Sequence, residues 1–465
     1  MRYSNMFKML GVSFKRFGEN IAITDGITSL TYSQLKRKSD RYSAFLINEG
    51  ISKNEVVGIQ MERSIEAIAA MIGVISSGAT YTVINPDYPR NRKELLMSEL
   101  NIKIVLDAFC ILPEEYNDLI YQDKIRSANT LSYIAFTSGT TGIPKAVGIS
   151  DKAILRLIKE PRLSFEEGKI MSHISPLEFD ASLIEIWCPL LKGMTISILS
   201  KKEVLNIFKV EERIRQGINI MWITSSLFNF WIDKNPELLV NVDCVIVGGE
   251  QLSLEHVQIA LNYTTVINGY GPTEGTVFTT LDVIGKLTNI NEISIETPVY
   301  GTSVYIIGEN GKEAQQGELY IAGDGLSIGY INSKAETKKK FIYWNDQKVY
   351  KTGDMVKKKK NGKIIYLGRI DRTVKIKGFR VDLGEIEYNV NRLNKVNCHA
   401  FVYKKKIIVV VSKNAKEVKQ TLIDNLPEFM RPSQIIELST FPLKKNGKVD
   451  TQLLEEKSIG LLDCQ

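Results

Sequence analysis

The sequence predicts an α/β protein with a large N-terminal domain of doubly wound sheets, a small β-barrel-like subdomain, and a small, mobile α+β C-terminal domain. Three observations predict this class. Strand-like runs alternate with helical stretches over most of the chain, short strands with glycine turns begin at about residue 295, and a compact α+β pattern returns after Gly368. With 465 residues, 44% hydrophobic and 24% charged, the chain has the composition of a globular protein.

The first part of the chain alternates between helix and strand. We expect helices over Ser33–Asn48 and Ser64–Ser76. Strands are expected at Val56–Gln60, Tyr81–Ile84, Ile102–Leu106, Thr195–Leu199, Ile220–Ile223 and Cys244–Val247. This alternation is typical of parallel, doubly wound sheets. The uncharged stretch from Ala67 to Pro86 contains serine, glycine and threonine, so it predicts a buried helix, turn and strand and not a membrane span.

The second part predicts antiparallel strands and then a separate domain. The runs VYIIGENGKEA, GELYIAG, KVYKTGD and KIIYLGR are short strands broken by turns. Beyond them we expect a helix over Leu383–Leu393 and strands near Ala400–Tyr403 and Ile407–Val411. The predicted domains are therefore residues 1–370, with the β-rich subdomain from about 295, and residues 371–465.

Charge, cysteines and the N-terminus exclude several classes of protein. A net charge of +7 over this length does not indicate nucleic-acid binding. Five cysteines without a C-x-x-C pair, with only three histidines, argue against a zinc site and a disulfide framework. The N-terminus lacks the apolar core of a signal peptide. We therefore expect reduced thiols, no membrane association and a cytoplasmic location.

The segment from Thr137 to Lys145, TSGTTGIPK, predicts a phosphate-contacting loop between two strands. Backbone N–H groups, hydroxyls and one cation all favour an anion. The spacing differs from that of a Walker A loop, and such a segment alone is often only a turn.

Nine motifs in order give the chain a resemblance to a known family. They are Leu30–Leu35, Leu131–Lys145, Phe179–Ser182, Asn268–Glu274, Gly317–Gly323 with Gly329-Tyr330, Tyr350–Asp354, Gly368–Asp371 leading to Lys375–Glu387, Leu426–Met430, and Asn446–Asp450. The chain resembles the adenylate-forming enzymes, and among them the amino-acid-activating adenylation domains of nonribosomal peptide synthetases (NRPSs). Ala146, Thr373 and Thr451 depart from the usual Gly, Gln and Arg, but none of these changes removes a group with a chemical task.

The resemblance implies two reactions. An amino-acid carboxylate joins the α-phosphate of ATP and pyrophosphate leaves; the aminoacyl group then passes to the phosphopantetheine thiol of a peptidyl carrier protein (PCP). A carboxylate with a pKa of about 3.5 is already ionised at pH 7, so no general base is required. The first reaction needs in-line positioning and neutralisation of phosphate charge.

The catalytic residues implied by the resemblance are Lys448, Thr273, Glu274 and Lys145. Lys448 is expected between the substrate carboxylate and the α-phosphate, although locally it also fits a solvated lysine in a turn. Thr273 is expected to contact the α-phosphate and Glu274 to bind Mg²⁺, because a carboxylate suits a hard cation.

The nucleotide is expected to lie among a second set of residues. Asn268 and Tyr270 would hold the adenine, and Asp354, assisted by Arg369, would accept the ribose hydroxyls; locally, Asp354 also fits a turn cap after glycine. The β- and γ-phosphates would lie under the loop residues Thr137, Ser138, Gly139, Thr140, Thr141 and Gly142.

Asp180 is expected to pair with the α-ammonium of an amino acid, shielded by Phe179, although it also fits an N-cap for the helix that follows. Motif alignment then gives the substrate pocket as Asp180, Ala181, Ile184, Trp222, Ile246, Gly248, Gly269, Val277, Phe278 and Lys448. Apart from Asp180 and Lys448 the set is uncharged. Gly248 and Gly269 are expected to leave the substrate pocket deep, and Trp222 and Phe278 are expected to make it narrow. The remaining space suits a branched aliphatic chain, and the set resembles those of valine-activating domains, so valine is the predicted substrate, followed by isoleucine or leucine.

Asp371 is expected to be the hinge about which the C-terminal domain turns between the two reactions.

Two alternative functions stay open: a CoA ligase for an acyl or aryl acid, and a catalytically idle carrier-docking module. The chain could act alone or as an excised part of a larger synthetase, with its PCP in trans or in cis.

Overall fold

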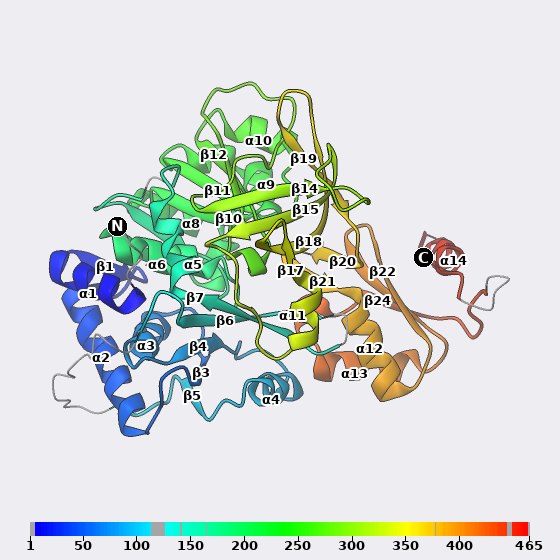
Figure 1. Ribbon diagram of the computed structural model, residues 1–465, viewed down its shortest axis with the longest axis horizontal. Coiled ribbons are helices and arrows are strands. Elements are labelled where there is room, and N and C mark those ends of the chain that lie inside the picture. Colours follow the sequence, from blue (N-terminus) through cyan, green and yellow to red (C-terminus); the bar gives the residue numbers. More distant parts are fainter. Residues whose placement is uncertain are drawn as a thin grey trace. The chain divides into compact units, whose positions relative to one another are not determined.

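The computed structural model describes residues 5–112, 126–139, 142–163, 165–376, 378–443 and 449–463. The chain divides into two compact units (Figure 1). The first unit consists of Met1–Pro86, Leu100–Phe136 and Ala146–Ile370. The second consists of Asp371–Gln465 together with two earlier segments, Asp87–Glu99 and Thr137–Lys145.

An eight-stranded sheet of the first unit has the order β13-β12-β11-β10-β8-β9-β1-β2. Its six central strands are parallel, and β13 and β2 add antiparallel edges. The strands are β1 (Ile21–Thr24), β2 (Ser29–Thr31), β8 (Ile170–His173), β9 (Thr195–Ile198), β10 (Ile220–Thr224), β11 (Cys244–Gly248), β12 (Thr265–Tyr270) and β13 (Thr280–Ile284). The carboxyl ends of β10, β11 and β12 therefore lie side by side.

A second sheet has the order β16-β7-β6-β4-β3-β5, and β5, β3, β4 and β6 are parallel. Its strands are β3 (Val56–Gln60), β4 (Thr80–Val83), β5 (Ile104–Asp107), β6 (Leu131–Thr137), β7 (Lys145–Ser150) and β16 (Gly329–Tyr330). One apolar cluster joins both sheets and includes Ile68, Trp187 and Ile196. The indole of Trp187 also donates a hydrogen bond to the hydroxyl of Tyr81 on β4 (3.0 Å).

Helices cover these sheets, and several begin at side-chain caps. Thr31 and Gln34 form a capping box at the start of α2, and Ser64 caps α3. Figure 1 shows α3 beside β3 and β4. The helices of the first unit are α1 (Met6–Arg16), α2 (Tyr32–Asn48), α3 (Ile65–Ser76), α5 (Asp151–Leu155), α6 (Ser182–Lys192), α7 (Lys201–Val204), α8 (Ile207–Arg215), α9 (Ser225–Lys234), α10 (Leu254–Ala260) and α11 (Lys334–Lys340), with short 3₁₀ turns at Leu157–Lys159, Pro236–Leu239 and Thr273–Gly275.

The β-rich part of the first unit is a five-stranded antiparallel sheet. Strands β14-β15-β18-β17 follow one another, and β19 pairs with the second half of β18. Their bounds are β14 (Thr302–Ile307), β15 (Gln316–Gly323), β17 (Phe341–Trp344), β18 (Gln347–Lys358) and β19 (Ile364–Arg369). The sequence predicts a barrel-like subdomain; the described strands form an open sheet instead, because the end strands β14 and β17 do not pair with each other.

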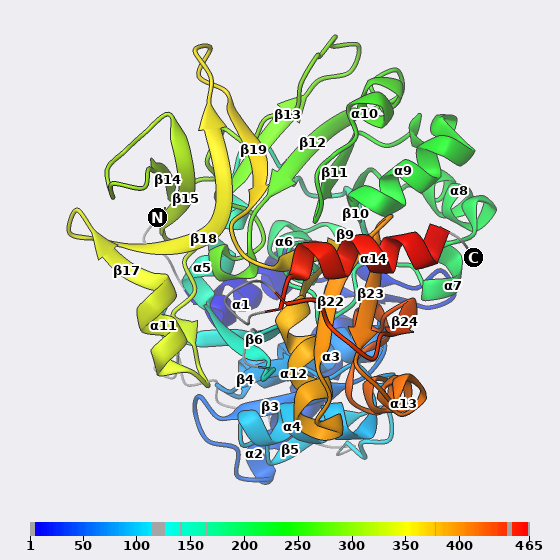
Figure 2. The ribbon, with the colours of Figure 1, turned by 90° about the vertical axis from the view of Figure 1, so that its right-hand side faces the viewer.

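The second unit contains a three-stranded sheet, β22-β23-β24, between helices. Alternate residues of β23 face opposite sides: Val409 packs with α12 and α13, whereas Ile408 and Val410 pack with Leu454 of α14. Figure 2 shows these three helices around the strands of the sheet. The elements are α4 (Arg90–Glu99), β20 (Thr373–Ile376), β21 (Phe379–Asp382), α12 (Leu383–Asn394), β22 (Cys398–Tyr403), β23 (Lys406–Val411), α13 (Ala415–Asn425), β24 (Gln434–Glu437) and α14 (Thr451–Asp463), with a 3₁₀ turn at Glu428–Met430.

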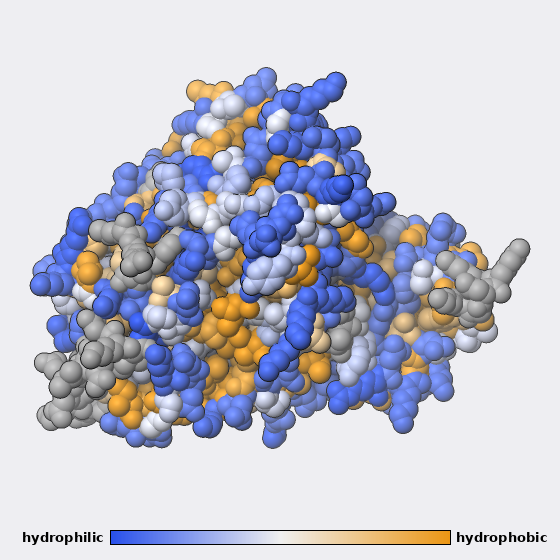
Figure 3. Space-filling view, in the orientation of Figure 1, coloured by the Kyte–Doolittle hydropathy of each residue, from blue (hydrophilic) through white to orange (hydrophobic). Residues whose placement is uncertain are grey.

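The surface is mainly hydrophilic on the face drawn in Figure 3, with apolar side chains gathered over β6 and β7. Ile328 and Ile331, whose backbone N–H groups bond to β7, are 45% and 39% exposed.

No described helix is both long and apolar enough to cross a membrane. The uncharged stretch after Ala67 forms helix, turn and strand, as predicted.

Candidate functional site

A strained turn follows β12 in the first unit. Thr273–Gly275 form a 3₁₀ turn, and the next two residues, Thr276 and Val277, have φ angles of 56° and 64°. The N–H of Phe278 bonds to the carbonyl of Thr276 (2.9 Å), which closes a tight γ-turn about Val277. Positive φ is unfavourable for β-branched residues and costs about 1–3 kcal/mol per residue. The surrounding residues must therefore hold this turn in place.

Asp180 lies beside this turn, between β8 and α6. Hydrogen bonding from the Thr273 side chain and from the backbone N–H groups of Val277 and Ala181 lowers the pKa of its carboxylate. Burial raises the pKa of Asp180, the nearby Glu274 raises it further, and the hydrogen bonds oppose the rise. Helix α6 starts at Ser182 without a side-chain cap, so the N-cap alternative for Asp180 is wrong. A desolvated carboxylate of this kind is well suited to an ammonium group.

Glu274 lies on the same turn and is fully buried. The hydroxyl of Tyr330 donates to its carboxylate (2.7 Å), and the N–H of Ser327 donates to its backbone carbonyl (2.8 Å). The described residues contain no group of three His, Cys, Asp or Glu that could hold a metal. Nucleotide sites usually bind Mg²⁺ through one carboxylate acting with substrate phosphates, and the Mg²⁺ role of Glu274 stays a prediction. Sequence reasoning gave no role to Tyr330, although the Gly329-Tyr330 motif pointed to it.

The predicted nucleotide residues gather at β12, β18 and β19. The hydroxyl of Tyr270 donates to one oxygen of Asp354 (2.5 Å), and Arg369 donates to the other (2.7 Å). The amide of Asn268 donates to the carbonyl of Ser294 (2.6 Å). Burial and the charge of Asp354 raise the pKa of Tyr270, so the phenol remains a donor. Asp354 lies within β18, so the turn-cap alternative is wrong.

The predicted pocket residues of the first unit are also adjacent. Trp222 of β10 lies opposite Ile246 of β11, and Gly248 lies opposite Gly269 of β12. One continuous apolar cluster contains Ala181, Ile184, Trp222, Ile246, Val277 and Phe278, with Phe179 packed against it. The indole N–H of Trp222 is buried and has no hydrogen-bond partner among the described residues.

The two pocket glycines serve close packing and do not leave depth, which corrects the expectation. A Cβ added at Gly269 would lie 2.4 Å from the ring of Phe278. A Cβ added at Gly248 would lie 2.4 Å from the carbonyl oxygen of Gly269. The Phe278 ring therefore fills the space that the sequence left beside Gly269.

The glycine-rich loop belongs to the second unit. Thr137 ends β6, and the hydroxyl of Ser138 donates to the carbonyl of Arg380 and accepts from the N–H of Asp382 (both 2.9 Å). Thr140 and Thr141 lie outside the described residues. Gly142 has a φ of 76°, a conformation that suits glycine.

A carboxylate engages the backbone of this loop. The N–H of Gly139 donates to Glu385 (3.1 Å), and Arg92 of α4 donates to the other oxygen of Glu385 (2.7 Å). Burial raises the pKa of Glu385, and Arg92 opposes the rise. A backbone N–H of this loop therefore donates to a carboxylate oxygen, and its contact with phosphate stays a prediction. Sequence reasoning missed Arg92 and gave no role to Glu385, although Glu385 lies in the quoted motif Lys375–Glu387.

Three further predicted residues belong to the second unit. Lys145 is buried at the start of β7, and its charge lowers the pKa of Asp382, which burial raises. Asp371 accepts a hydrogen bond from the N–H of Thr373 (3.1 Å). Lys448 lies outside the described residues.

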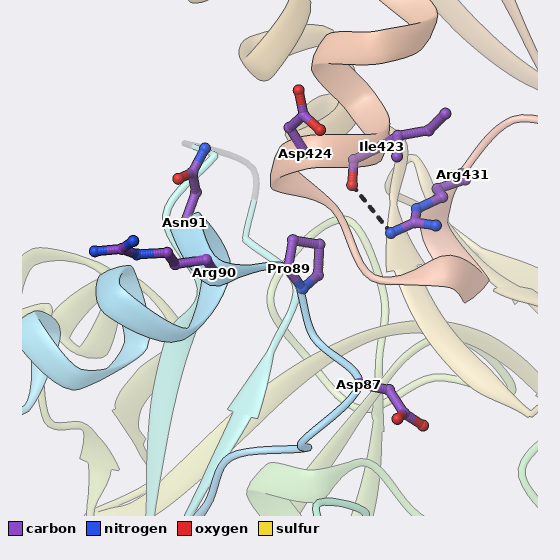
Figure 4. A pocket seen from close by; sticks show the side chains of 7 residues that line it. All are labelled: Asp87, Pro89, Arg90, Asn91, Ile423, Asp424 and Arg431. Carbon is purple, nitrogen blue, oxygen red and sulfur yellow. Dashed lines mark hydrogen bonds between the residues drawn. The ribbon is translucent and has the colours of Figure 1, made fainter.

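A cavity of about 360 Å³ in the second unit contains none of the predicted site residues (Figure 4). Its lining residues are Asp87, Pro89, Arg90, Asn91, Ile423, Asp424 and Arg431. Arg431 donates to the carbonyls of Ile423 and Leu426 at the end of α13 (both 3.0 Å). This contact stabilises the helix end, because it satisfies carbonyls that have no partner within the helix.

Known proteins resemble this chain over nearly its whole length. The profile of a protein family described as AMP-binding enzyme matches residues 12–331. Bacitracin synthase 1 of Bacillus licheniformis is 33% identical over 475 residues, and gramicidin S synthase 2 of Brevibacillus brevis is 30% identical over 481 residues. Both alignments cover 94% of this chain, which spans only 9% and 11% of those proteins.

Solved structures show the same fold. Holo-PA1221, described as an NRPS protein containing adenylation and PCP domains bound to a vinylsulfonamide inhibitor, matches with a TM-score of 0.87 at 28% identity, covering 98% of this chain and 84% of that one. A second structure of PA1221 matches with a TM-score of 0.86 at 27% identity, covering 98% and 97%. The α/β fold class and the resemblance to adenylation domains are therefore confirmed.

Proposed function

The chain belongs to the family of AMP-binding enzymes, and from this premise we propose that it is an amino-acid adenylating ligase. It joins the carboxylate of an amino acid to AMP, releases pyrophosphate, and then transfers the aminoacyl group to the phosphopantetheine thiol of a carrier protein. The similarity to the bacitracin and gramicidin S synthases supports this activity, and so does the similarity to an NRPS protein with adenylation and PCP domains.

One observation carries the amino-acid assignment. Asp180 places a desolvated carboxylate next to the apolar cluster that contains Ile184, Trp222 and Ile246. A carboxylate at the edge of an apolar pocket is suited to a substrate with a positive charge next to an apolar side chain. Since the α-ammonium and the side chain of an amino acid leave the same carbon, one molecule satisfies both.

The nucleotide is proposed to bind at the Tyr270–Asp354–Arg369 cluster. Asp354 accepts the ribose hydroxyls, Tyr270 stacks on the adenine, and Asn268 contacts its edge. Thr273 contacts the α-phosphate, and the loop Thr137–Lys145 binds the β- and γ-phosphates. Mg²⁺ held by Glu274 would neutralise phosphate charge.

Lys448 and Asp371 are proposed to divide the two reactions between two orientations of the C-terminal domain. Lys448 supplies a positive charge to the carboxylate and the α-phosphate during adenylation. A turn at Asp371 then removes that lysine so that the carrier thiol can attack. A rotation of this kind separates two reactions that use one site.

Valine is the proposed substrate. None of the eight positions that read the side chain carries a charge or an amide, so a charged side chain would lose its hydration without gaining a partner. Phe278 and Trp222 limit the space to a short branched chain. Isoleucine and leucine differ by one methylene, which an apolar pocket discriminates by about 10- to 200-fold.

The carrier protein is the proposed partner, in cis or in trans.

Cys188 and Cys244 are buried free thiols, and burial raises the pKa of Cys244 to about 12, which keeps it protonated. Thiols of this kind fit the cytoplasm, which is the proposed location.

The test is amino-acid-dependent exchange of labelled pyrophosphate into ATP, with all twenty amino acids. We expect valine to give the highest signal. Exchange with an aryl or fatty acid and a free CoA product would instead support the CoA ligase. Absence of exchange with every acid, in a protein that binds ATP, would support the idle docking module.

A further inference from the structure

Arg156 is a fully buried arginine at the end of α5, and it contacts the strained turn directly. One nitrogen of its guanidinium donates to the backbone carbonyls of Gly275 (2.6 Å), Thr276 (3.0 Å) and Phe278 (2.6 Å). The second nitrogen donates to the hydroxyl of Thr302 (3.1 Å). A single guanidinium group therefore hydrogen-bonds to three backbone carbonyls of one turn.

The peptide between Thr276 and Val277 connects this cation to Asp180. Its carbonyl accepts from Arg156 (3.0 Å), and hydrogen bonding from its N–H lowers the pKa of the Asp180 carboxylate. The positive φ angles of both residues turn the peptide into this orientation. Since β-branched residues avoid such angles, the orientation depends on the contacts at both ends of the peptide.

We propose that Arg156 is the positioning residue of the amino-acid site: it holds the Thr276–Val277 peptide so that the Val277 N–H orients Asp180 and the Val277 side chain faces the pocket. The inference rests on the proposed function for its substrate. Arg156 has no contact with the substrate in this proposal, and it acts only through the turn.

Gly325 shows how closely the guanidinium is packed. A Cβ at this position would lie 2.1 Å from the Nε of Arg156 and 2.3 Å from its Cζ. Gly325→Ala therefore displaces the head of Arg156 while the charge remains in the protein. It provides a second variant that tests position separately from charge.

Arg162 offers a matched control in the same unit. It also donates to three backbone carbonyls, those of Leu281 (2.6 Å), Thr297 (3.1 Å) and Pro298 (2.7 Å), but none of them belongs to the turn. Arg162→Met therefore removes a comparable bridge without touching Asp180 or Val277.

The experiment compares Arg156→Met, Arg156→Lys, Gly325→Ala and Arg162→Met in pyrophosphate exchange with L-valine, or with the best substrate of the panel. We expect Arg156→Met to raise the KM for the amino acid about 10- to 100-fold while the KM for ATP changes less than about threefold. Arg156→Lys and Gly325→Ala should give intermediate values, and Arg162→Met should change only the melting temperature. An unchanged amino-acid KM in folded Arg156→Met, or an equal rise in Arg162→Met, overturns the proposal.

A crystal structure of Arg156→Met gives a readout that does not require the proposed activity. We expect Val277 to adopt a negative φ and its N–H to leave Asp180. If Val277 keeps its positive φ and its bond to Asp180, the proposal is wrong. If wild-type protein shows no exchange but the turn rearranges in the variant, the proposed function fails while the positioning role stands.

Discussion

The phenol of Tyr270 donates a hydrogen bond to the carboxylate of Asp354, a residue 84 positions later in the chain. Arg369 neutralises the same carboxylate from the paired strand β19, where it lies directly opposite Asp354. The bond joins the eight-stranded sheet to the antiparallel sheet. The proposed adenine and ribose contacts are therefore made by one connected group.

Tyr270→Phe is expected to weaken ATP binding selectively. The variant keeps the aromatic ring for adenine but loses the hydrogen bond that orients Asp354. A hydrogen bond to a charged group contributes about 1.5–3 kcal/mol of free energy. Because this bond orients Asp354, part of that free energy is lost from ATP binding, and we expect the KM for ATP to rise about tenfold. Steady-state exchange at varied ATP measures this. An equal rise in the KM for the amino acid would contradict the assignment of this cluster to the nucleotide.

The pH dependence of amino-acid binding is expected to follow Asp180. Burial and the nearby Glu274 raise the pKa of Asp180 in the free protein, and only the ionised carboxylate attracts an ammonium group. As the pH falls through this raised pKa, the carboxylate takes up a proton and the KM for the amino acid rises. Asp180→Asn should bind weakly at every pH and remove this dependence. A pH profile of Asp180→Asn parallel to that of the wild type would assign the ionisation to another group.

Much of this architecture could be predicted from local sequence. The strand Val56–Gln60 has the predicted bounds because its run of apolar residues marks both ends. Helix α2 begins one residue earlier than expected, directly after its threonine cap, Thr31. The site was predictable only as far as motifs reached. Asp180, Glu274 and Asp354 lie in such motifs, and the structure places Glu274 and Asp354 in buried, hydrogen-bonded positions and Asp180 in a half-buried one.

The remaining features depend on long-range contacts that leave no local signal. Arg156 is one of 60 basic residues and lies in no quoted motif. Thr276 and Val277 are β-branched and would suggest a strand, yet tertiary contacts impose positive φ on both. The expectation of depth beside Gly269 was wrong because the Phe278 ring, nine residues later, occupies that space.

The second unit is expected to lose stability on the alkaline side of pH 6.5. Burial alone would lower the pKa of His399, but hydrogen bonds to Glu387 and Glu455 raise it above 6.5. A histidine with a raised pKa contributes its full stabilisation below pH 6.5 and loses it as the pH rises through the folded value. Thermal unfolding of the full chain from pH 5 to 8.5 measures this. We expect His399→Gln to remove the loss of stability at alkaline pH. The control is His256→Gln, because His256 pairs with the exposed Asp233, and this variant should retain that loss.

The acidic side depends on Glu387. Burial alone would raise its pKa, but hydrogen bonds from His399, Arg372 and the Ala400 N–H lower it to about 2 from 4.5. Its stabilisation is therefore present above pH 4.5 and is lost as the pH falls toward 2. Glu387→Gln should lower the melting temperature at pH 6, by roughly 2–4 °C for each 1 kcal/mol lost. An unchanged melting temperature would show that the cluster does not stabilise this unit.

Lys448→Ala is expected to abolish adenylation while ATP binding survives. Loss of one cation that acts in the transition state typically lowers the rate about 10²- to 10³-fold. The second reaction, assayed with supplied aminoacyl adenylate and a carrier protein, should continue. Lys405→Ala is the control, because this exposed lysine lies in a turn of the same unit. Equal loss of both reactions in Lys448→Ala would contradict its proposed role.

Phe278 is expected to set the size of the substrate side chain. Its ring lies against Gly269, so Phe278→Leu opens space at that point without adding a polar group. Isoleucine and leucine should then gain on valine by about tenfold, since one methylene in an apolar pocket changes binding by about 1–3 kcal/mol. Phe228→Leu is the matched control: Phe228 is fully buried in α9 within a different apolar cluster, so the substitution should lower stability but leave the ranking unchanged. The twenty-amino-acid exchange panel measures both variants. If both change the ranking alike, or neither does, selectivity does not depend on the Phe278 ring.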